Sequence, residues 1–201
     1  MKYSILLISA TALFFFACGP RQEQASHIHD PEVAAALFTF EHDMSAAFFE
    51  NLKTLCGKSF AGRQVYVQEG RESWADRNMV MYVTRCDEEA IHVPFHMDED
   101  QSRTWMFLNE EGRLRFRHDH RHPDGTPEDL TLYGGYADTE QGTPYRQVFP
   151  ADEYTIEIHP RSVNSYWVVE LKEEMRVFSY SLYSNDALLF EAHFDLTQPL
   201  E

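Results

Sequence analysis

The chain has 201 residues, a length that one domain accommodates, since single β domains commonly reach ~200 to 250 residues. Its 33 acidic residues outnumber 17 basic ones and give a formal net charge of −16, which opposes binding to nucleic acid and to anionic lipid head groups. Aromatic residues make up 14% of the chain and, with many Val and Ile residues, favour strands over helices. The composition therefore excludes a nucleic-acid-binding role and predicts a mainly β domain.

Residues 1–17 have the features of a signal peptide. Lys2 precedes an apolar run at residues 5–16, which is too short to span a bilayer comfortably. No second hydrophobic segment follows. We therefore expect an exported chain whose remaining part is soluble.

The end of this run, FFAC, resembles the lipobox of bacterial lipoproteins, because small Ala17 stands directly before Cys18. The sequence departs from that pattern at Phe15, where Leu is usual. The resemblance implies cleavage before Cys18, acylation of this cysteine and, because Gly19 rather than Asp follows, sorting to the outer membrane. Lipid chains would be the only contact with the membrane, since each buried methylene contributes ~0.8 kcal/mol. An ordinary secretory signal cut nearby is the alternative.

Residues 18–29 are polar and without periodicity, which predicts a flexible tether, and residues 30–201 form the single folded domain. The segment 30–57 predicts an amphipathic helix. Asp30 can cap it, Pro31 suits its first position and Gly57 supplies the stop. The apolar stripe consists of Val33, Leu37, Met44, Phe48, Leu52 and Leu55.

Alternation with period two then predicts about ten short strands. An antiparallel up-and-down β-barrel of about ten strands, with the one N-terminal helix covering an end, leaves no exposed sheet edge. The expected strands are residues 63–69, 78–86, 90–97, 103–109, 112–122, 129–134, 145–149, 153–159, 165–171 and 176–196, the last divided at the turn SNDA.

Two stretches carry a family resemblance. The segment NLKTLCGKSFAG, residues 51–62, is similar to the entry into the first strand of lipocalin-like (calycin) barrels, although Phe60 follows Gly57 by three places where lipocalins usually have Trp two places on. QSRTW, ending at Trp105, and HDHRHPDG, residues 118–125, resemble elements of an uncharacterised group of exported bacterial lipoproteins. The resemblance implies a lipocalin-like β-barrel and no particular activity.

If Cys18 carries the lipid anchor, two cysteines remain, Cys56 and Cys86. An even pair in an exported chain predicts a disulfide. Free thiols or thiolate ligands are the alternative, but the spacing matches no Cys-x-x-Cys motif.

The stretch RLRFRHDHRH places Leu114, Phe116, His118, His120 and His122 on one face of a strand. Leu114 and Phe116 require burial, so we expect the three imidazoles to line the barrel from mid-interior to its mouth. Such side chains can recognise a polar or anionic small molecule in a pocket. Tyr133, Trp105 and Arg103 are the expected neighbours in this ligand site.

Metal binding is the second hypothesis. Two histidines one residue apart on a strand can share an ion, and Zn or Fe would need a third ligand. Asp124 is the first candidate for this third ligand, and Glu128 is the second. The spacing from Gly112 through His118 and His120 to Asp124 is similar to the first cupin motif, which prefers Glu at the last position. The second cupin motif is absent. This hypothesis predicts a metal-dependent, cupin-like enzyme.

Three functions therefore remain: a lipid-anchored envelope protein with a histidine-lined pocket for a small molecule, the metal-dependent enzyme, and a structural or partner-binding lipoprotein with inert histidines. No hydrolase elbow, phosphate loop or dinucleotide fingerprint occurs. The balance favours a protein that is not an enzyme and has no cofactor. Alternation predicts that His92, His96, His159 and His193 face outward.

Overall fold

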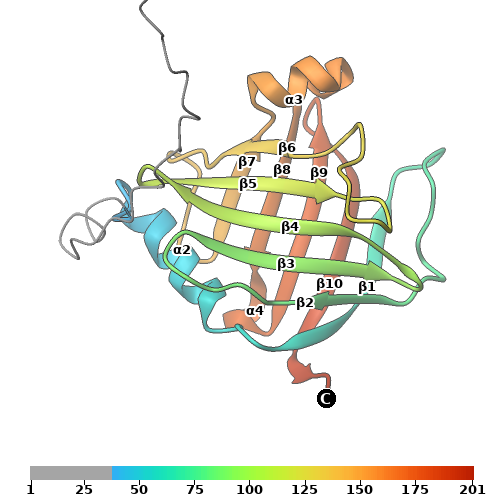
Figure 1. Cartoon of the computed structure of the whole chain (residues 1–201), viewed down its shortest axis with the longest axis horizontal. Coiled ribbons are helices and arrows are strands. Elements are labelled where there is room, and N and C mark those ends of the chain that lie inside the picture. The colour runs from blue at the N-terminus through green and yellow to red at the C-terminus, as the bar shows by residue number, and fades with distance from the viewer. Residues whose placement is uncertain (1–37) are drawn as a thin grey trace, which may run out of the picture.

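A computed structural model describes residues 38–201 (Figure 1). Its main element is one antiparallel sheet of ten strands. The strands are β1 (Ser59–Val67), β2 (Met79–Tyr82), β3 (Ala90–Met97), β4 (Asp100–Glu110), β5 (Arg113–His120), β6 (Tyr133–Tyr136), β7 (Arg146–Pro150), β8 (Ser165–Leu171), β9 (Val177–Ser184) and β10 (Ala187–Pro199).

The strands follow one another in sequence order around the sheet, and β1 pairs with β10. The ladder is interrupted only between β6 and β7, which makes the molecule a nearly closed up-and-down barrel. Two backbone hydrogen bonds bridge this seam: the Asp138 N–H donates to the Val148 carbonyl at 2.8 Å, and the Asp152 N–H donates to the Gly134 carbonyl at 3.0 Å. The predicted mainly β, antiparallel architecture is confirmed.

Two glycines in β6 allow close approach on both sides of this strand. A Cβ atom on Gly135 would lie 1.8 Å from the carbonyl oxygen of Pro150 in β7, and one on Gly134 would lie 2.0 Å from the carbonyl oxygen of Phe116 in β5. No side chain fits at either distance. Gly135 therefore lets β6 approach β7 closely at the seam, and Gly134 lets β6 approach its ladder partner β5.

Helix α2 (Asp43–Lys53) covers one end of the barrel (Figure 1). It lies within the segment for which a helix is predicted, but residues 39–42 are outside any helix and residues 30–37 are outside the described residues. Phe48 and Leu52 are fully buried, and the rings of Phe48 and Phe107 are 6.0 Å apart. Met44, which the predicted apolar stripe includes, is 43% exposed.

The Cys56–Cys86 disulfide lies at this same end. It joins the segment after α2 to the connection between β2 and β3, with a Cα–Cα distance of 6.2 Å. Next to it, the Gly57 N–H donates to the Val83 carbonyl at 2.8 Å. The predicted pairing of the two cysteines is confirmed.

Aromatic rings fill the barrel in layers. Near α2, Phe107 and Phe116 are 5.0 Å apart, measured between ring centroids, and Phe116 and Phe149 are 5.1 Å apart. In the middle, Trp105 stacks on Phe95 at 4.9 Å and on Tyr180 at 4.7 Å. These contacts make a continuous aromatic core that begins under α2.

The strand predicted at residues 153–159 is wrong. The segment forms helix α3 (Glu153–Ile158) and the short helix η1 (Pro160–Ser162). The alternation of Tyr154, Ile156 and Ile158 suggested a strand, but Asp152 caps a helix: its carboxylate accepts a hydrogen bond from the Thr155 N–H at 2.9 Å. The short segment α4 (Lys172–Met175) is a tight turn before β9, and three of its residues have left-handed backbone conformations.

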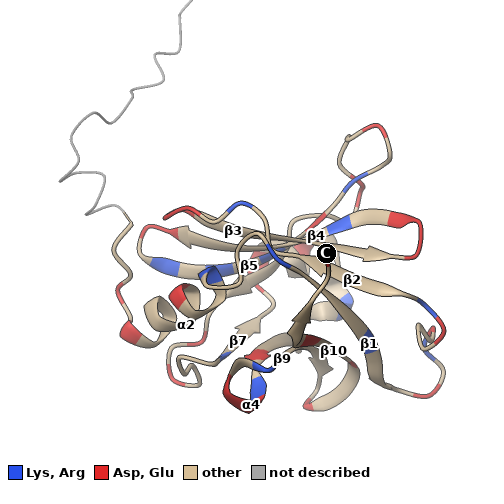
Figure 2. Ribbon diagram, turned by 90° about the horizontal axis from the view of Figure 1, so that it is seen from below, with Lys and Arg blue, Asp and Glu red and all other residues tan. Residues whose placement is uncertain are grey.

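Other boundaries move by a few residues. Strand β5 ends at His120, where continuation to His122 was expected, and β6 begins at Tyr133, later than predicted. The last predicted range divides into β9 and β10 at the SNDA turn, whose two central residues, Asn185 and Asp186, have positive φ angles. No helix within residues 38–201 is long and apolar enough to cross a membrane. Figure 2 shows acidic positions in many separate turns of the ribbon.

Candidate ligand-binding site

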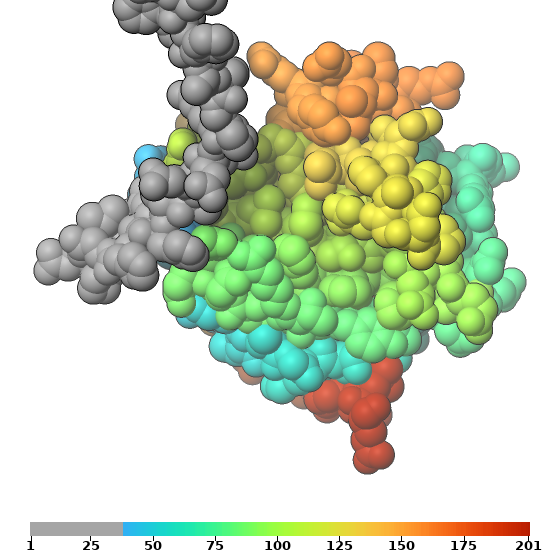
Figure 3. Space-filling model, in the orientation of Figure 1, coloured from blue at the N-terminus to red at the C-terminus, as the bar shows by residue number. Residues whose placement is uncertain are grey.

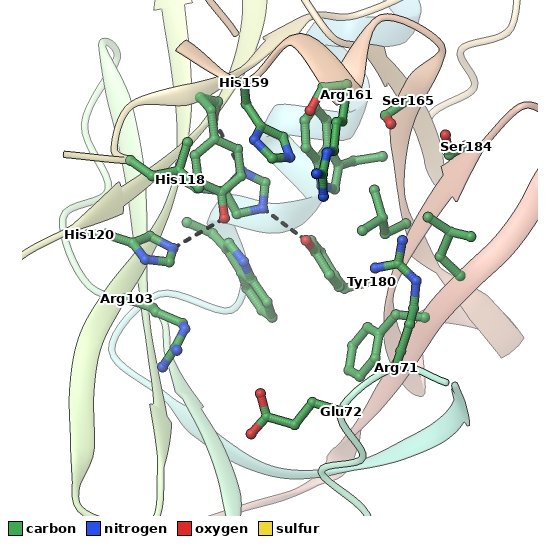
Figure 4. A pocket seen from close by; sticks show the side chains of 18 of the residues that line it. Arg71, Glu72, Arg103, His118, His120, His159, Arg161, Ser165, Tyr180 and Ser184 are labelled. Atoms are coloured by element: carbon green, nitrogen blue, oxygen red, sulfur yellow. Dashed lines mark hydrogen bonds between the residues drawn. The ribbon is translucent and has the colours of Figure 1, made fainter. Parts of the chain in front are cut away.

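A cavity of about 510 Å³ opens at the end of the barrel away from α2. Around this end the chain makes three excursions, formed by residues 68–78, residues 121–132 and α3 with η1 (Figures 1 and 3). The aromatic residues that line the cavity are Trp74, Phe95, Trp105, Tyr133, Trp167, Tyr180 and Phe190. Its charged or titratable lining residues are Arg71, Glu72, Arg103, His118, His120, His159 and Arg161 (Figure 4).

The alternation along β5 is confirmed as far as this strand extends. Leu114 and Phe116 are buried in the core, His118 is 3% exposed and His120 is partly buried. Both histidines line the cavity. The inward-facing residues therefore progress from the packed core to the cavity, as the alternation along the strand predicts.

His118 is held by two hydrogen bonds that fix its tautomer. Its Nδ1 atom lies 3.2 Å from the Tyr133 carbonyl oxygen and its Nε2 atom lies 2.9 Å from the Tyr180 hydroxyl. A carbonyl oxygen only accepts, so Nδ1 carries the proton and donates, and Nε2 accepts from the Tyr180 O–H when the ring is neutral. The ring also stacks on that of Tyr133, with centroids 4.3 Å apart.

Burial keeps these groups uncharged. Desolvation lowers the pKa of His118 to about 3, and it raises the pKa of Tyr133 to about 12. The pKa of Tyr180 is also raised, again because of burial. The inner wall of the cavity is therefore neutral near pH 7, and His118 acts there as a neutral hydrogen-bonding group.

His120 lies nearer the mouth. Its Nε2 atom is 3.2 Å from the Tyr133 hydroxyl, and its Nδ1 atom is 3.8 Å from a Glu128 carboxylate oxygen. Burial is the main reason why its pKa is lowered, and the charge of Arg103 adds to this effect. The imidazole thus presents a neutral, partly accessible polar group beside the aromatic lining.

Of the other predicted ligand-site residues, Trp105, Arg103 and Tyr133 line the cavity, and His122 does not. His122 is exposed because β5 ends two residues earlier and the chain turns, with the His122 N–H donating to the Thr126 carbonyl at 2.9 Å. The prediction that His122 lies in the pocket is therefore wrong.

The candidate third metal ligand, Asp124, is exposed in the same turn, and its carboxylate accepts from the N–H of Thr126 at 2.9 Å. The structure brings His118 and His120 into one cavity but does not bring Asp124 to them. Within residues 38–201, no three His, Cys, Asp or Glu side chains are placed to hold one metal ion.

His159 and Arg161 were missed. Alternation placed His159 outward on a strand, but η1 brings both residues to the cavity (Figure 4). The signal for this arrangement was the pair of helix markers, Asp152 as a cap and Pro160 as a helix start. Arg71, Trp74 and Tyr180 had no local signal, because a loop and a distant strand bring them to the site.

Arginines on the outer face of β5 hold α3 in place. Arg115 and Arg117 pair with the Asp152 carboxylate at 2.7 and 3.0 Å, and Arg117 is buried. In addition, the Thr155 hydroxyl donates to the Gly134 carbonyl at 2.8 Å. One face of β5 thus supplies the cavity histidines, while the other face positions the element that carries Arg161.

Three of the histidines that are expected to face outward, His92, His96 and His193, lie elsewhere. His92 and His96 are on the face of β3 opposite its buried residues and are partly buried, with the His96 ring 4.5 Å from that of Tyr82. His193, on β10, has its Nε2 atom 2.7 Å from a Glu191 carboxylate oxygen. None of these three lines the cavity.

Comparison of the chain with protein-family models, with curated proteins and with solved structures finds no significant match. The cavity itself therefore carries the functional argument. It combines a mostly apolar, aromatic interior with a few fixed polar groups, an arrangement that suits the binding of a small organic molecule.

Proposed function

We propose that this protein is a lipid-anchored cell-envelope protein that binds a small molecule in the open end of a lipocalin-like barrel. The observation that carries this proposal is the cavity of about 510 Å³ beside His118 and His120. Its size is within the range of about 300 to 1,000 Å³ that is typical of ligand pockets. A structural protein with inert histidines would be expected to have a filled interior instead.

The order of the strands supports the lipocalin-like part of the proposal. The chain enters β1 directly after α2, with Gly57 at the stop and Phe60 fully buried, as the resemblance at residues 51–62 implies. The strands then follow one another as an antiparallel meander, broken only at the seam between β6 and β7, and the first and last strands pair.

All three tryptophans of the chain, Trp74, Trp105 and Trp167, line the cavity. Their fluorescence is therefore a direct reporter of its occupancy. We expect the neutral aromatic probe N-phenyl-1-naphthylamine to quench this emission through energy transfer and to bind with a Kd between about 1 and 100 μM.

A cavity-filling variant makes this test specific. Ser165 and Ser184 pair across β8 and β9 and both line the cavity (Figure 4). The double substitution Ser165→Phe, Ser184→Phe should weaken probe binding more than about tenfold, which corresponds to about 1.4 kcal/mol. Tyr166→Phe, on the outer face of β8, is the control and should leave binding unchanged. Equal binding by the filled variant would contradict the proposed site.

Cys18 lies outside the described residues, so the anchor is a separate part of the proposal. Mass spectrometry of the exported protein should find Cys18 at the mature N-terminus with acyl chains. Cys18→Ala should release the protein from the membrane fraction. Recovery of the unmodified chain in the soluble fraction, cut at another position, would instead support an ordinary secretory signal.

The metal-dependent enzyme stays a prediction. Zn or Fe at His118 and His120 would require Nε2 of His118 to exchange its Tyr180 partner for the ion and a third ligand to approach. Metal analysis of protein purified without a histidine tag tests it: a stoichiometric ion that is lost in the His118→Ala, His120→Ala variant would favour the enzyme.

A further inference from the structure

The charge of the cavity lining is opposite in sign to that of the whole chain. The chain has a formal net charge of −16. Three arginines line the cavity, however, and Glu72 is the single carboxylate among the lining residues. A positive opening on an acidic protein concentrates anions at that place and repels cations, because the cavity walls limit screening by solvent.

Two of the arginines have no other role in the described part of the chain. The guanidinium groups of Arg71 and Arg161 make no hydrogen bond or ion pair within residues 38–201, and both side chains are exposed and extend toward the hollow (Figure 4). Arg103, on the other side of the hollow, is paired with Asp100, and its guanidinium lies 5.7 Å from the centroid of the Trp74 ring. The cationic groups that are available to a ligand are therefore at the mouth.

The interior of the cavity offers the opposite environment. His118 is neutral, and its two ring nitrogens are bonded to Tyr133 and Tyr180, so that layer has no charge to offer and little unused hydrogen-bonding capacity. The rings of Trp105 and Trp167 also line the cavity, and the centroids of the His118 and Trp167 rings are 5.1 Å apart. An ionic group placed at this depth would lose its hydration without gaining a partner.

We propose that the cavity takes a singly charged organic anion with an aromatic body. The body enters toward Trp105 and Trp167, and the carboxylate or similar head group stays at the mouth between Arg71 and Arg161. Guanidinium groups bind such heads through paired, charge-assisted hydrogen bonds. This inference rests on the proposed binding function and adds the charge and the orientation of the ligand.

Two fluorescent probes with the same aromatic body test the charge directly. 1-Anilinonaphthalene-8-sulfonate carries one negative charge, and N-phenyl-1-naphthylamine is its neutral counterpart. We expect the anion to bind at least about tenfold more tightly, because only the anion can form charge-assisted hydrogen bonds with the guanidinium groups. Raising the salt concentration should weaken binding of the anionic probe and leave binding of the neutral probe unchanged.

The variant Arg71→Gln, Arg161→Gln should lower the affinity for the anion at least about tenfold and change that for the neutral probe less than about twofold. Arg63→Gln, Arg176→Gln is the matched control, because it removes two exposed arginines outside this cavity and changes the net charge equally. The control should leave both affinities unchanged.

The outcomes separate the two proposals. Tight binding of the neutral probe with no gain from the sulfonate, or an equal loss of anion affinity in the control, would overturn the anion inference and leave the small-molecule pocket standing. Binding of neither probe would overturn both. Loss of anion binding confined to the Arg71 and Arg161 variant would support the assignment.

Discussion

The two ends of the barrel are built on different principles. At the covered end, α2 and the Cys56–Cys86 bridge enclose a cluster of fully buried rings that includes Phe48 and Phe107. At the open end, aromatic residues surround a cavity whose rim carries arginines without an ion pair in the described chain. The packed rings and the disulfide at the covered end stabilise the fold, whereas the open end leaves its cavity and the unpaired arginines accessible. Substitutions at the two ends should therefore separate folding from recognition.

The largest expected effect is at the covered end. Phe107→Ala removes a fully buried ring that contacts Phe48, Phe116 and Phe149. It should lower the free energy of unfolding by about 3 to 5 kcal/mol, because both transfer energy and packing are lost. Urea denaturation measures this loss. Val65→Ala, at an exposed position of β1, is the control and should cost less than about 0.5 kcal/mol.

Reduction of the disulfide should have the next largest effect. The bridge closes a loop with a sequence separation of 30 residues, which corresponds to about 3 to 4 kcal/mol in the chain-entropy model. The melting temperature should fall by several degrees in the reductant and in the Cys56→Ala, Cys86→Ala variant. Ligand affinity should be unchanged below the new transition. A loss of binding in the folded, reduced protein would show that the two ends are coupled.

His118 makes the open end sensitive to acid. Burial lowers its pKa from the ordinary histidine value of 6.5 to about 3 in the folded protein. Between these pH values only the unfolded chain takes up the proton, so stability falls as pH decreases from 6.5 toward 3. At pH 5 the loss is about 2 kcal/mol.

The test compares the difference in unfolding free energy between pH 7 and pH 5 in three proteins. This difference should be about 2 kcal/mol smaller in His118→Gln than in the parent chain. His122→Gln removes an exposed imidazole from the same segment and should behave like the parent. A pH dependence that is identical in all three would contradict the buried, neutral state of His118.

The smallest effect on stability is expected at the rim. Arg71 and Arg161 are exposed and unpaired in the described residues, so replacing both with Gln should change the free energy of unfolding by less than about 0.5 kcal/mol. The same variant should lose binding of the anionic probe. A large loss of stability would mean that these arginines hold the barrel together and would remove the contrast between its ends.

Local patterns in the sequence predicted most of the barrel. Alternation along β3, β5 and β8 follows from the geometry of a strand, in which successive side chains point to opposite faces. That rule correctly placed Leu114, Phe116, His118 and His120 inside. It failed at residues 153–159, where Asp152 satisfies the first turn of a helix and overrides an alternating pattern.

The candidate site was only half predictable. Two cavity histidines and the neighbours Trp105, Arg103 and Tyr133 came from β5 and adjoining segments. Tyr180 is 62 residues from its partner His118, and Arg161 reaches the mouth only because Asp152 docks α3 on the outer face of β5. Asp152 and Pro160 mark the helices locally, but no local pattern encodes where α3 docks or that Tyr180 meets His118.

The sequence alone determined the class of fold, the disulfide and the inward face of β5, because these depend on the pattern of neighbouring residues and, for the disulfide, on the expectation that the chain is exported. The tertiary structure decided where β5 ends, which strands adjoin at the seam and which cations surround the opening. These features depend on closure of the sheet, which brings distant segments together through packing and hydrogen bonds that form only in the folded chain.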